Sequence, residues 1–193
     1  LAKQFLEQQA IQLAGGDTPS FAFTFDMNRL FEGFIAGFLV RYRAAILPEA
    51  MRHCQIHVQA HGMTHVLAHA GTTACFRLAP DIVLHCGSDI PIMIDTKYKL
   101  LNQYDRKLGV STADFYQMYA YARRFACPRV VLLYPQTAAL STALWRRFQL
   151  DTVSGYDIVA QTIDIRLDLR QPAARLQLQQ ELAKIFSQEP GHV

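Results

Sequence analysis

Two runs of β-forming residues separated by a short turn constrain the fold of this chain more than any other feature. Residues 81–84 and 90–94 are rich in Ile, Val and Leu, and Gly87, Ser88 and Asp89 lie between them. Branched apolar side chains favour strands, whereas Gly, Ser and Asp favour tight turns. The pattern predicts an antiparallel hairpin.

Amphipathic helices are predicted on both sides of this hairpin in the sequence. Asp26 can cap a helix whose apolar side chains recur at the spacing of one helical face, at Phe31, Phe34, Ile35 and Phe38. Ser111, with Asp114 three residues later, begins a second helix. Residues 129–134 then contain an unbroken apolar run, Val130 to Leu133, which is typical of a strand covered on both faces.

The two ends of the chain predict further elements. Residues 1–13 show helical spacing, so residues 1–20 are interpreted as an N-terminal helix and loop, and residues 21–193 as one domain. Residues 138–148 predict a short helix, and the alternation at 163–169 predicts a half-exposed strand. Pro172 can begin a last helix. The order of elements indicates an α/β (α+β) domain around a mixed central sheet.

Composition excludes several classes of protein. With 193 residues, 51% of them hydrophobic and 18% charged, the chain is too apolar for a disordered tail. Its formal net charge of +3 is too small to indicate a nucleic-acid partner by itself. It has no signal-peptide pattern at its start and no apolar stretch approaching ~20 residues, so we expect a cytoplasmic protein. Its four cysteines form no C-x-x-C pair and are expected to be reduced.

Charged residues at the ends of the predicted hairpin are the strongest candidates for chemistry. Asp81 follows Pro80 at the head of the first strand, and Asp95, Thr96 and Lys97 end the second. Pairing of the strands can bring the two carboxylates together, and with a main-chain carbonyl they suit Mg²⁺. Lys97 leaves the same face of the strand as Asp95 and could hold an attacking water. A buried structural ion pair is the alternative interpretation.

Polar side chains on the two predicted helices could complete this site. Gln117 and Tyr121 are four residues apart on one helical face, and Asp114 lies one turn earlier. Alternatively, Asp114 is only a cap and Tyr121 only a core residue. Glu32 on the first helix could be a further metal ligand or a base that orients water, or it could simply face solvent.

Four blocks of sequence resemble a known nuclease family. The blocks are DMNRLFE at 26–32, LAPDIV at 78–83, IDTKYK at 94–99 and DFYQMYAYA at 114–122. They resemble the PD-(D/E)xK nuclease superfamily, in the branch where a Q-x-x-x-Y helix follows the lysine. Within it they are similar to the McrC family, the nuclease subunits of modified-cytosine restriction systems. The resemblance covers about residues 25–135.

The resemblance implies a restriction-endonuclease-like core, a mixed sheet flanked by helices, that hydrolyses DNA phosphodiesters with Mg²⁺, for which Mn²⁺ can substitute. The implied metal ligands are Asp81, Asp95 and the Thr96 carbonyl; Lys97 would assist the attacking water, and Glu32 would complete the site. The implied supporting residues are Gln117, Tyr121 and Asp114. The implied weaker DNA contacts are Lys99, Arg106 and Lys107.

The family also implies a partner. Its nuclease subunits join an AAA+ GTPase ring of the McrB type, and this chain has no G-x-x-x-x-G-K-[ST] phosphate-binding loop of its own. A stand-alone nuclease of DNA repair or of a mobile element stays open as an alternative. So does a nuclease-like module that binds DNA or assembles a complex without cutting.

A series of histidines offers a third alternative. Five histidines recur at every fourth position and would form a zinc-binding ladder on a helix: His53, His57, His61, His65 and His69. Gly62 and the alternating apolar residues around it favour strands and a turn instead, where that spacing gives no common helical face. The family resemblance assigns these histidines no role.

Overall fold

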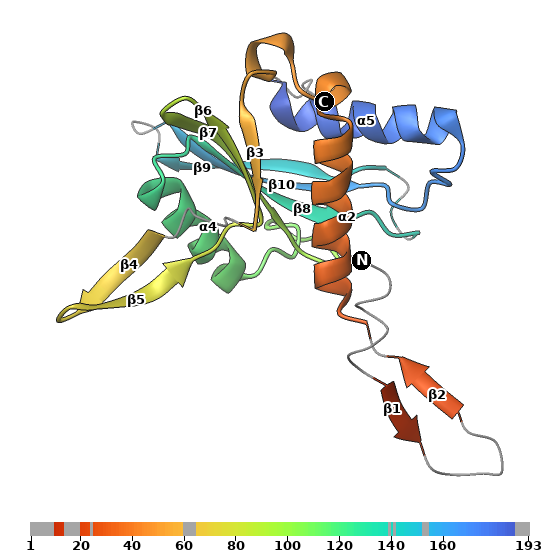
Figure 1. The fold of residues 1–193 in the computed structure, drawn as a ribbon, viewed down its shortest axis with the longest axis horizontal. Coiled ribbons are helices and arrows are strands. Elements are labelled where there is room, and N and C mark those ends of the chain that lie inside the picture. Colours follow the sequence, from red (N-terminus) through yellow and green to blue (C-terminus); the bar gives the residue numbers. More distant parts are fainter. Residues whose placement is uncertain are drawn as a thin grey trace.

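A central six-stranded sheet organises the chain (Figure 1). The structure, a computed structural model, describes residues 10–13, 20–23, 25–59, 65–138, 140, 142–151 and 155–187. The strand order is β3-β6-β7-β8-β10-β9, with β7, β8 and β10 parallel and the other neighbours antiparallel. The bounds are β3 Gln55–Val58, β6 Ile82–Cys86, β7 Asp89–Thr96, β8 Arg129–Pro135, β9 Trp145–Asp151 and β10 Tyr156–Ile163.

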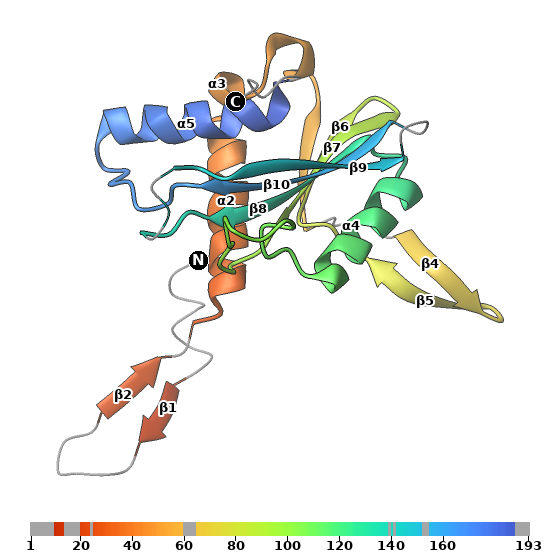
Figure 2. The same ribbon diagram turned by 180° about the vertical axis from the view of Figure 1, so that it is seen from behind.

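Helices cover both faces of this sheet, as Figures 1 and 2 show from opposite sides. Helices α2 (Met27–Arg41), α3 (Arg43–Ile46) and α5 (Pro172–Phe186) contribute to one hydrophobic core, and α4 (Thr112–Arg124) to the other. A 3₁₀ turn, η1 (Glu49–Met51), follows α3. This is the mixed α/β domain that the sequence predicts, with the restriction-endonuclease-like arrangement that the family resemblance implies. Within the described residues, no helix is both long and apolar enough to cross a membrane.

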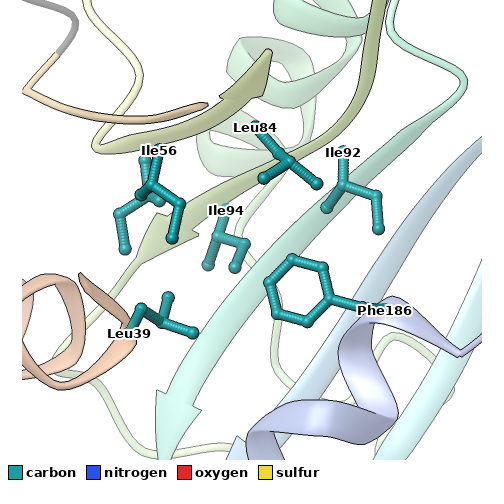
Figure 3. Close-up of a pocket in the computed structure, with 7 residues that line it drawn as sticks. Leu39, Ile56, Leu84, Ile92, Ile94 and Phe186 are labelled. Carbon is teal, nitrogen blue, oxygen red and sulfur yellow. The ribbon is translucent and has the colours of Figure 1, made fainter. Parts of the chain in front are cut away.

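The first core joins the two long helices to the sheet (Figure 3). Leu39 of α2 and Phe186 of α5 point toward apolar side chains of the sheet, which are Ile56, Ile82, Leu84, Ile92 and Ile94. The space left between them is about 10 Å³ and its lining is entirely apolar, so the junction is closely packed and offers a water no hydrogen-bond partner. Strand β8 is buried on both faces, as its unbroken apolar run predicts.

Local sequence signals place the elements that carry the site. The Asp26 carboxylate accepts hydrogen bonds from the backbone N–H groups of Asn28 and Arg29 and begins α2. The Ser111 hydroxyl accepts from the N–H of Asp114 at 3.1 Å and begins α4. The β6–β7 hairpin forms in the predicted place, with Ile82 opposite Ile94.

The N-terminal prediction is wrong where the structure tests it. Residues 10–13 belong to a strand, β1 (Ala10–Leu13), which pairs antiparallel with β2 (Ser20–Phe23). A spacing of three to four apolar residues is ambiguous in so short a segment, and the backbone of β2 supplies the hydrogen-bond partners of a strand. The rest of the predicted helix lies outside the described residues. The domain boundary at residue 20 stays a prediction.

Two C-terminal predictions are also corrected. The segment predicted as a short helix at 138–148 contains the start of β9, because this edge strand finds backbone partners along β10. The last strand, β10, ends at Ile163, where the predicted strand begins. In the segment that follows, Asp164 and Asp168 bind the backbone and side chains of the arginines two residues later, and these local bonds favour a loop. Helix α5 begins at Pro172 as predicted.

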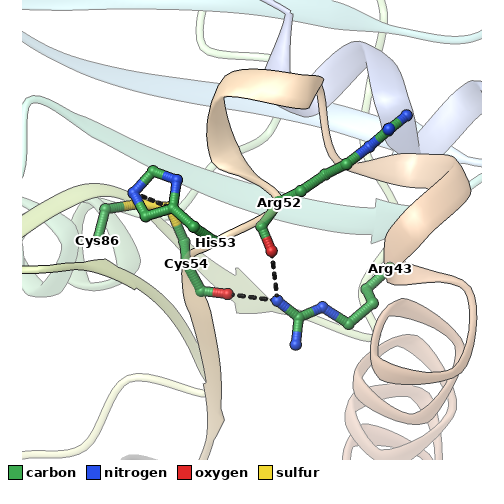
Figure 4. The surroundings of a disulfide bond; sticks show 5 residues. All are labelled: Arg43, Arg52, His53, Cys54 and Cys86. Carbon is green, nitrogen blue, oxygen red and sulfur yellow. Dashed lines mark hydrogen bonds between the residues drawn. A yellow bond between two sulfur atoms is a disulfide. The ribbon is translucent and has the colours of Figure 1, made fainter.

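The cysteines differ from expectation as well. Cys54 and Cys86 form a disulfide, while Cys75 and Cys127 are free (Figure 4). Gln55 pairs with His85 across β3 and β6, so the next residues outward, Cys54 and Cys86, face each other. Their separation of 32 residues left no local motif, and only the register of β3 on β6 shows the pairing.

Hydrogen bonds connect the segment next to the disulfide to helix α3. The guanidinium group of Arg43 in α3 donates hydrogen bonds to the backbone carbonyls of Arg52, at 2.8 Å, and Cys54, at 2.6 Å (Figure 4). Edge strand β3 is therefore anchored at its start by both a covalent bond and a charged side chain.

Candidate active site

Asp81 and Asp95 lie side by side because of the hairpin register. Asp81 immediately precedes β6 and Asp95 is the penultimate residue of β7, next to the paired residues Ile82 and Ile94. Asp95 is only 2% exposed. Burial and the nearby charge of Asp81 raise the pKa of Asp95 to about 7, although the Lys97 ammonium opposes this shift.

Thr96 holds the carboxylate of Asp81 in place. Oδ2 of Asp81 accepts one hydrogen bond from the Thr96 backbone N–H at 2.7 Å and another from the Thr96 hydroxyl at 2.8 Å. Both bonds use the same oxygen. Among the described residues no hydrogen bond engages Oδ1, so this oxygen can serve another ligand.

Lys97 bridges the buried carboxylate and α4. Its Nζ lies 2.6 Å from Oδ2 of Asp95 and donates a hydrogen bond to Oε1 of Gln117 at 3.2 Å. Burial lowers the pKa of Lys97, but the charge of Asp95 and its hydrogen bond outweigh this and raise it, so Lys97 stays an ammonium. The predicted same-face relation of Asp95 and Lys97 is therefore present.

Gln117 connects Lys97 to a buried tyrosine. Its Nε2 donates to the hydroxyl of Tyr121 at 3.0 Å, one helical turn later. Tyr121 also forms a hydrogen bond with the backbone of Ala79, just before Asp81. Burial raises the pKa of Tyr121, which therefore keeps its proton. The Gln117 and Tyr121 pair thus links the lysine to the segment that carries Asp81.

Asp114 makes a second ion pair beside the first. Nζ of Lys99 donates to both oxygens of Asp114, at 2.7 and 3.1 Å. Burial opposes ionisation of Asp114, but hydrogen bonds from Lys99 and Ser111 hold its pKa below the usual range. Lys99, predicted as a weak DNA contact, is directed toward α4 in this structure.

Glu32 lies near Asp81 rather than on a solvated face. Burial and the charge of Asp81 raise the pKa of Glu32, while a hydrogen bond from the Gln59 side chain partly opposes this shift. Gln59 was not predicted as part of the site. Its backbone N–H also donates to the Asp81 carbonyl at 2.6 Å. No sequence motif indicates Gln59, because its position depends on how β3 pairs with β6.

Other predicted residues do not join this cluster. Arg106 and Lys107 are exposed in the loop after β7, where the Arg106 carbonyl accepts a hydrogen bond from Arg146 and the Lys107 N–H binds Asp105. They show no contact with the paired aspartates among the described residues. Their role as DNA contacts stays a prediction.

The histidine series is divided between distant elements. His53 lies beside the disulfide, His57 in β3, and His65 and His69 in β4 (His65–Ala70), whereas His61 lies outside the described residues. The predicted alternative of a helical zinc ladder is therefore wrong for the described members.

The donor set of the paired aspartates fits Mg²⁺. Two carboxylates and the adjacent Thr96 carbonyl are hard oxygen ligands, and burial together with the charge of Asp81 raises the pKa of Asp95, so a cation beside the pair would favour its ionised form. The ligand atoms of Asp81, Asp95 and Glu32 do not all lie within 4.8 Å of one another, because the one such trio among the described residues is His53, Cys54 and Cys86. The carboxylate site thus rests on Asp81 and Asp95.

Comparison with known proteins identifies the family. The sequence model of the family described as "McrBC 5-methylcytosine restriction system component" matches residues 1–135. No curated protein sequence matches the chain. Among solved structures, a chain of the refined half-complex from the tetradecameric assembly of Thermococcus gammatolerans McrB AAA+ hexamers with bound McrC has the same fold, with a TM-score of 0.61 and 22% identity.

That likeness covers 86% of this chain and 34% of the solved chain, so the present chain spans about a third of that relative's length. The family match extends over the α2, β6–β7 and α4 segments that build the paired-aspartate site. The chain belongs to the McrBC 5-methylcytosine restriction system family.

Proposed function

We propose that this chain is the DNA endonuclease domain of an McrC-like restriction subunit and that it cuts phosphodiester bonds with Mg²⁺, or with Mn²⁺ in its place. The observation that carries the proposal is the convergence of Asp81, Asp95 and Lys97 at the end of the β6–β7 hairpin. A structural ion pair needs one carboxylate. Here a second carboxylate raises the pKa of the first, an arrangement that costs stability unless a cation joins it.

The proposed metal ligands are Asp81, Asp95 and the Thr96 carbonyl. When bound there, Mg²⁺ would supply a Lewis acid that lowers the pKa of water and neutralises charge on the phosphate. Thr96 would keep Asp81 in position through its two hydrogen bonds to Oδ2. Burial of Asp95 keeps competing water away from its carboxylate.

Lys97 would act as a fixed positive charge. Its raised pKa argues against a role as the general base, so its ammonium would stabilise the negative charge that develops on phosphate oxygens as water attacks phosphorus and the leaving oxygen departs. Gln117 would hold the ammonium in place. Glu32, whose pKa is raised, is the proposed acceptor of the proton that the attacking water loses.

The proposed partner is an AAA+ GTPase of the McrB type. The solved structure that shares this fold is described as McrB AAA+ hexamers with bound McrC, and the present chain has no phosphate-binding loop of its own. The partner would supply GTP hydrolysis and recognition of modified cytosine, and this chain would supply the cut. Cleavage assays with and without that partner distinguish this function from a stand-alone nuclease.

Nicking of supercoiled plasmid tests the proposal. With Mg²⁺ or Mn²⁺ and the GTPase partner, we expect the parent chain to nick DNA, and Asp95→Asn and Lys97→Met to cut at least about 100-fold more slowly. Lys184→Met, which removes an exposed lysine of α5 that has no role in the proposed site, is the matched control. Equal cutting by Lys97→Met and the parent would contradict the roles assigned here, and a parent that binds Mn²⁺ without cutting would favour the inactive module.

A further inference from the structure

A two-stranded hairpin projects from the body of the domain beside the proposed site. Within the part of the chain that the structure describes, strands β4 and β5 (Thr73–Leu78) pair only with each other, and they extend beyond α4 (Figures 1 and 2). The base is anchored, because His65 packs edge-on against Phe125 at 4.3 Å and Nε of Arg124 donates to the Val66 carbonyl at 3.1 Å. Beyond that base the side chains on both faces are largely exposed.

The described residues that flank this hairpin in the sequence lie at the paired-aspartate site. Strand β5 ends at Leu78, three residues before Asp81. On the other side, β3 ends just before Gln59, whose N–H donates to the Asp81 carbonyl. Six residues per strand at ~3.3 Å each give an arm of roughly 20 Å. The arm therefore starts at the site and can reach about six base pairs of a duplex bound there.

Two large apolar side chains are exposed on this arm. Leu67 is 50% exposed and Phe76 is 73% exposed. They lie opposite each other, because Val66 pairs with Arg77 and Ala68 pairs with Cys75 on either side of them. Two large apolar side chains in this position add little to folding, since solvent still reaches them.

The backbone of Phe76 adds to this observation. Its φ of 55° lies in the left-handed region, which costs free energy for a bulky aromatic residue. Neither burial nor a preferred backbone conformation explains an aromatic ring at this position. A ligand that covers the ring would.

Charge identifies the kind of ligand. The sequence from residue 50 to residue 80 contains no Asp or Glu, but it contains two arginines and five histidines. Arg77 is exposed on the arm and Arg124 lies at its base. A surface with positive charge, no carboxylates and an exposed aromatic ring suits a polyanion that also presents flat apolar groups, which is the chemistry of a nucleic acid.

We propose that the β4–β5 hairpin is a DNA-binding arm, in which Arg77 contacts a backbone phosphate and Phe76, with Leu67, packs on a base or sugar of the DNA held at the Asp81 and Asp95 site. The choice of DNA rests on the proposed function. A second copy of this chain or the GTPase partner are the other possible occupants, and the experiment separates them.

Equilibrium binding of a fluorescent 30-base-pair duplex tests the arm, with Ca²⁺ replacing Mg²⁺ to suppress cutting and KCl varied from 50 to 200 mM. Arg77→Gln should weaken binding about three- to tenfold and lower the salt slope by about one. Phe76→Asn should weaken binding at least about fivefold with an unchanged slope. Asn tolerates a positive φ, so this variant should melt no earlier than the parent.

Arg52→Gln is the matched control, because it removes the other arginine of the acid-free segment at the opposite end of β3, and it should bind as the parent does. If both arm variants bind DNA as tightly as the parent, the proposal that the hairpin binds DNA is wrong. If they also lose self-association or binding to the GTPase partner, the hairpin is the docking site for that protein instead. If the parent chain still cuts DNA in that case, the proposed nuclease function stands without the proposed arm. If the arm variants weaken DNA binding but the parent chain never cuts DNA, the proposed nuclease function is wrong and the proposed arm stands.

Discussion

The hydroxyl and backbone N–H of Thr96 both bind one oxygen of Asp81, so the residue that follows Asp95 positions the carboxylate of Asp81. This relationship joins the start of β6 to the end of β7 at the point where the two carboxylates meet. It also gives Thr96 a role for its side chain in addition to the proposed role of its carbonyl.

Replacement of Thr96 tests this arrangement. Thr96→Val keeps the shape of the buried side chain but removes the hydroxyl, so we expect a loss of about 1 kcal/mol in the free energy of unfolding and a weaker affinity for Mn²⁺ by about three- to tenfold. Thr96→Ser keeps the hydroxyl and should bind Mn²⁺ nearly as the parent does. Calorimetric titration and urea unfolding measure both effects, and equal Mn²⁺ affinity in Thr96→Val and the parent would contradict the arrangement.

The raised pKa of Asp95 predicts how stability depends on pH without metal. The folded-state pKa of about 7 exceeds the ordinary value of 3.8, so the folded chain retains a proton that the unfolded chain loses. The contribution of Asp95 to the free energy of unfolding is therefore fully present below about pH 4, and it is lost as the pH rises toward and through 7.

Urea unfolding at pH 5.5 and pH 8.0 in EDTA measures this effect. The parent should lose on the order of 1 kcal/mol or more between the two values, and Asp95→Asn, which cannot ionise, should lose less. Mn²⁺ affinity of the parent should increase over the same range because protons compete with the metal. An identical pH dependence in the parent and Asp95→Asn would show that Asp95 ionises normally.

The hydrogen bonds of Gln117 predict a separation of cutting from metal binding. Gln117→Leu removes the acceptor of Lys97 and the donor to Tyr121. The ammonium then loses its orientation, so we expect cutting to slow about tenfold or more while Mn²⁺ affinity stays within about twofold of the parent. Thr112→Ala, at an exposed position of the same helix, is the control, and a parental cutting rate in Gln117→Leu would remove Gln117 from the site.

The disulfide predicts a stability that depends on reducing agent. The bond between Cys54 and Cys86 closes a loop of 32 residues, and its loss should lower the free energy of unfolding by up to about 3–4 kcal/mol. Urea unfolding with and without dithiothreitol measures this difference. Cys54→Ser should abolish the response, whereas Cys75→Ser should keep it, and a parent with four titratable thiols in the absence of reductant would contradict the pairing.

Short-range signals were sufficient to predict the elements that carry the site. Asp26 and Ser111 cap their helices through bonds to residues two or three positions away, and the β6–β7 turn is equally local. The positions of Asp81, Asp95 and Lys97 follow from that hairpin. These features could be predicted because each depends on neighbours that are close in the sequence.

Features that depend on long-range pairing could not be predicted. Gln59 approaches Asp81, and Cys54 approaches Cys86, only through the register of β3 on β6. Likewise, β9 is a strand because β10 offers it an edge, which no local preference of its sequence showed. Tertiary contacts outweigh local propensity in such segments.

The most direct test of the central claim is a calorimetric titration of Mn²⁺ into the metal-free chain and its variants Asp81→Asn, Asp95→Asn and Lys97→Met. The account predicts saturable binding in the parent, loss of that binding in either aspartate variant, and its retention in Lys97→Met. Binding that is unchanged by Asp81→Asn, or absent from the correctly folded parent, would contradict it.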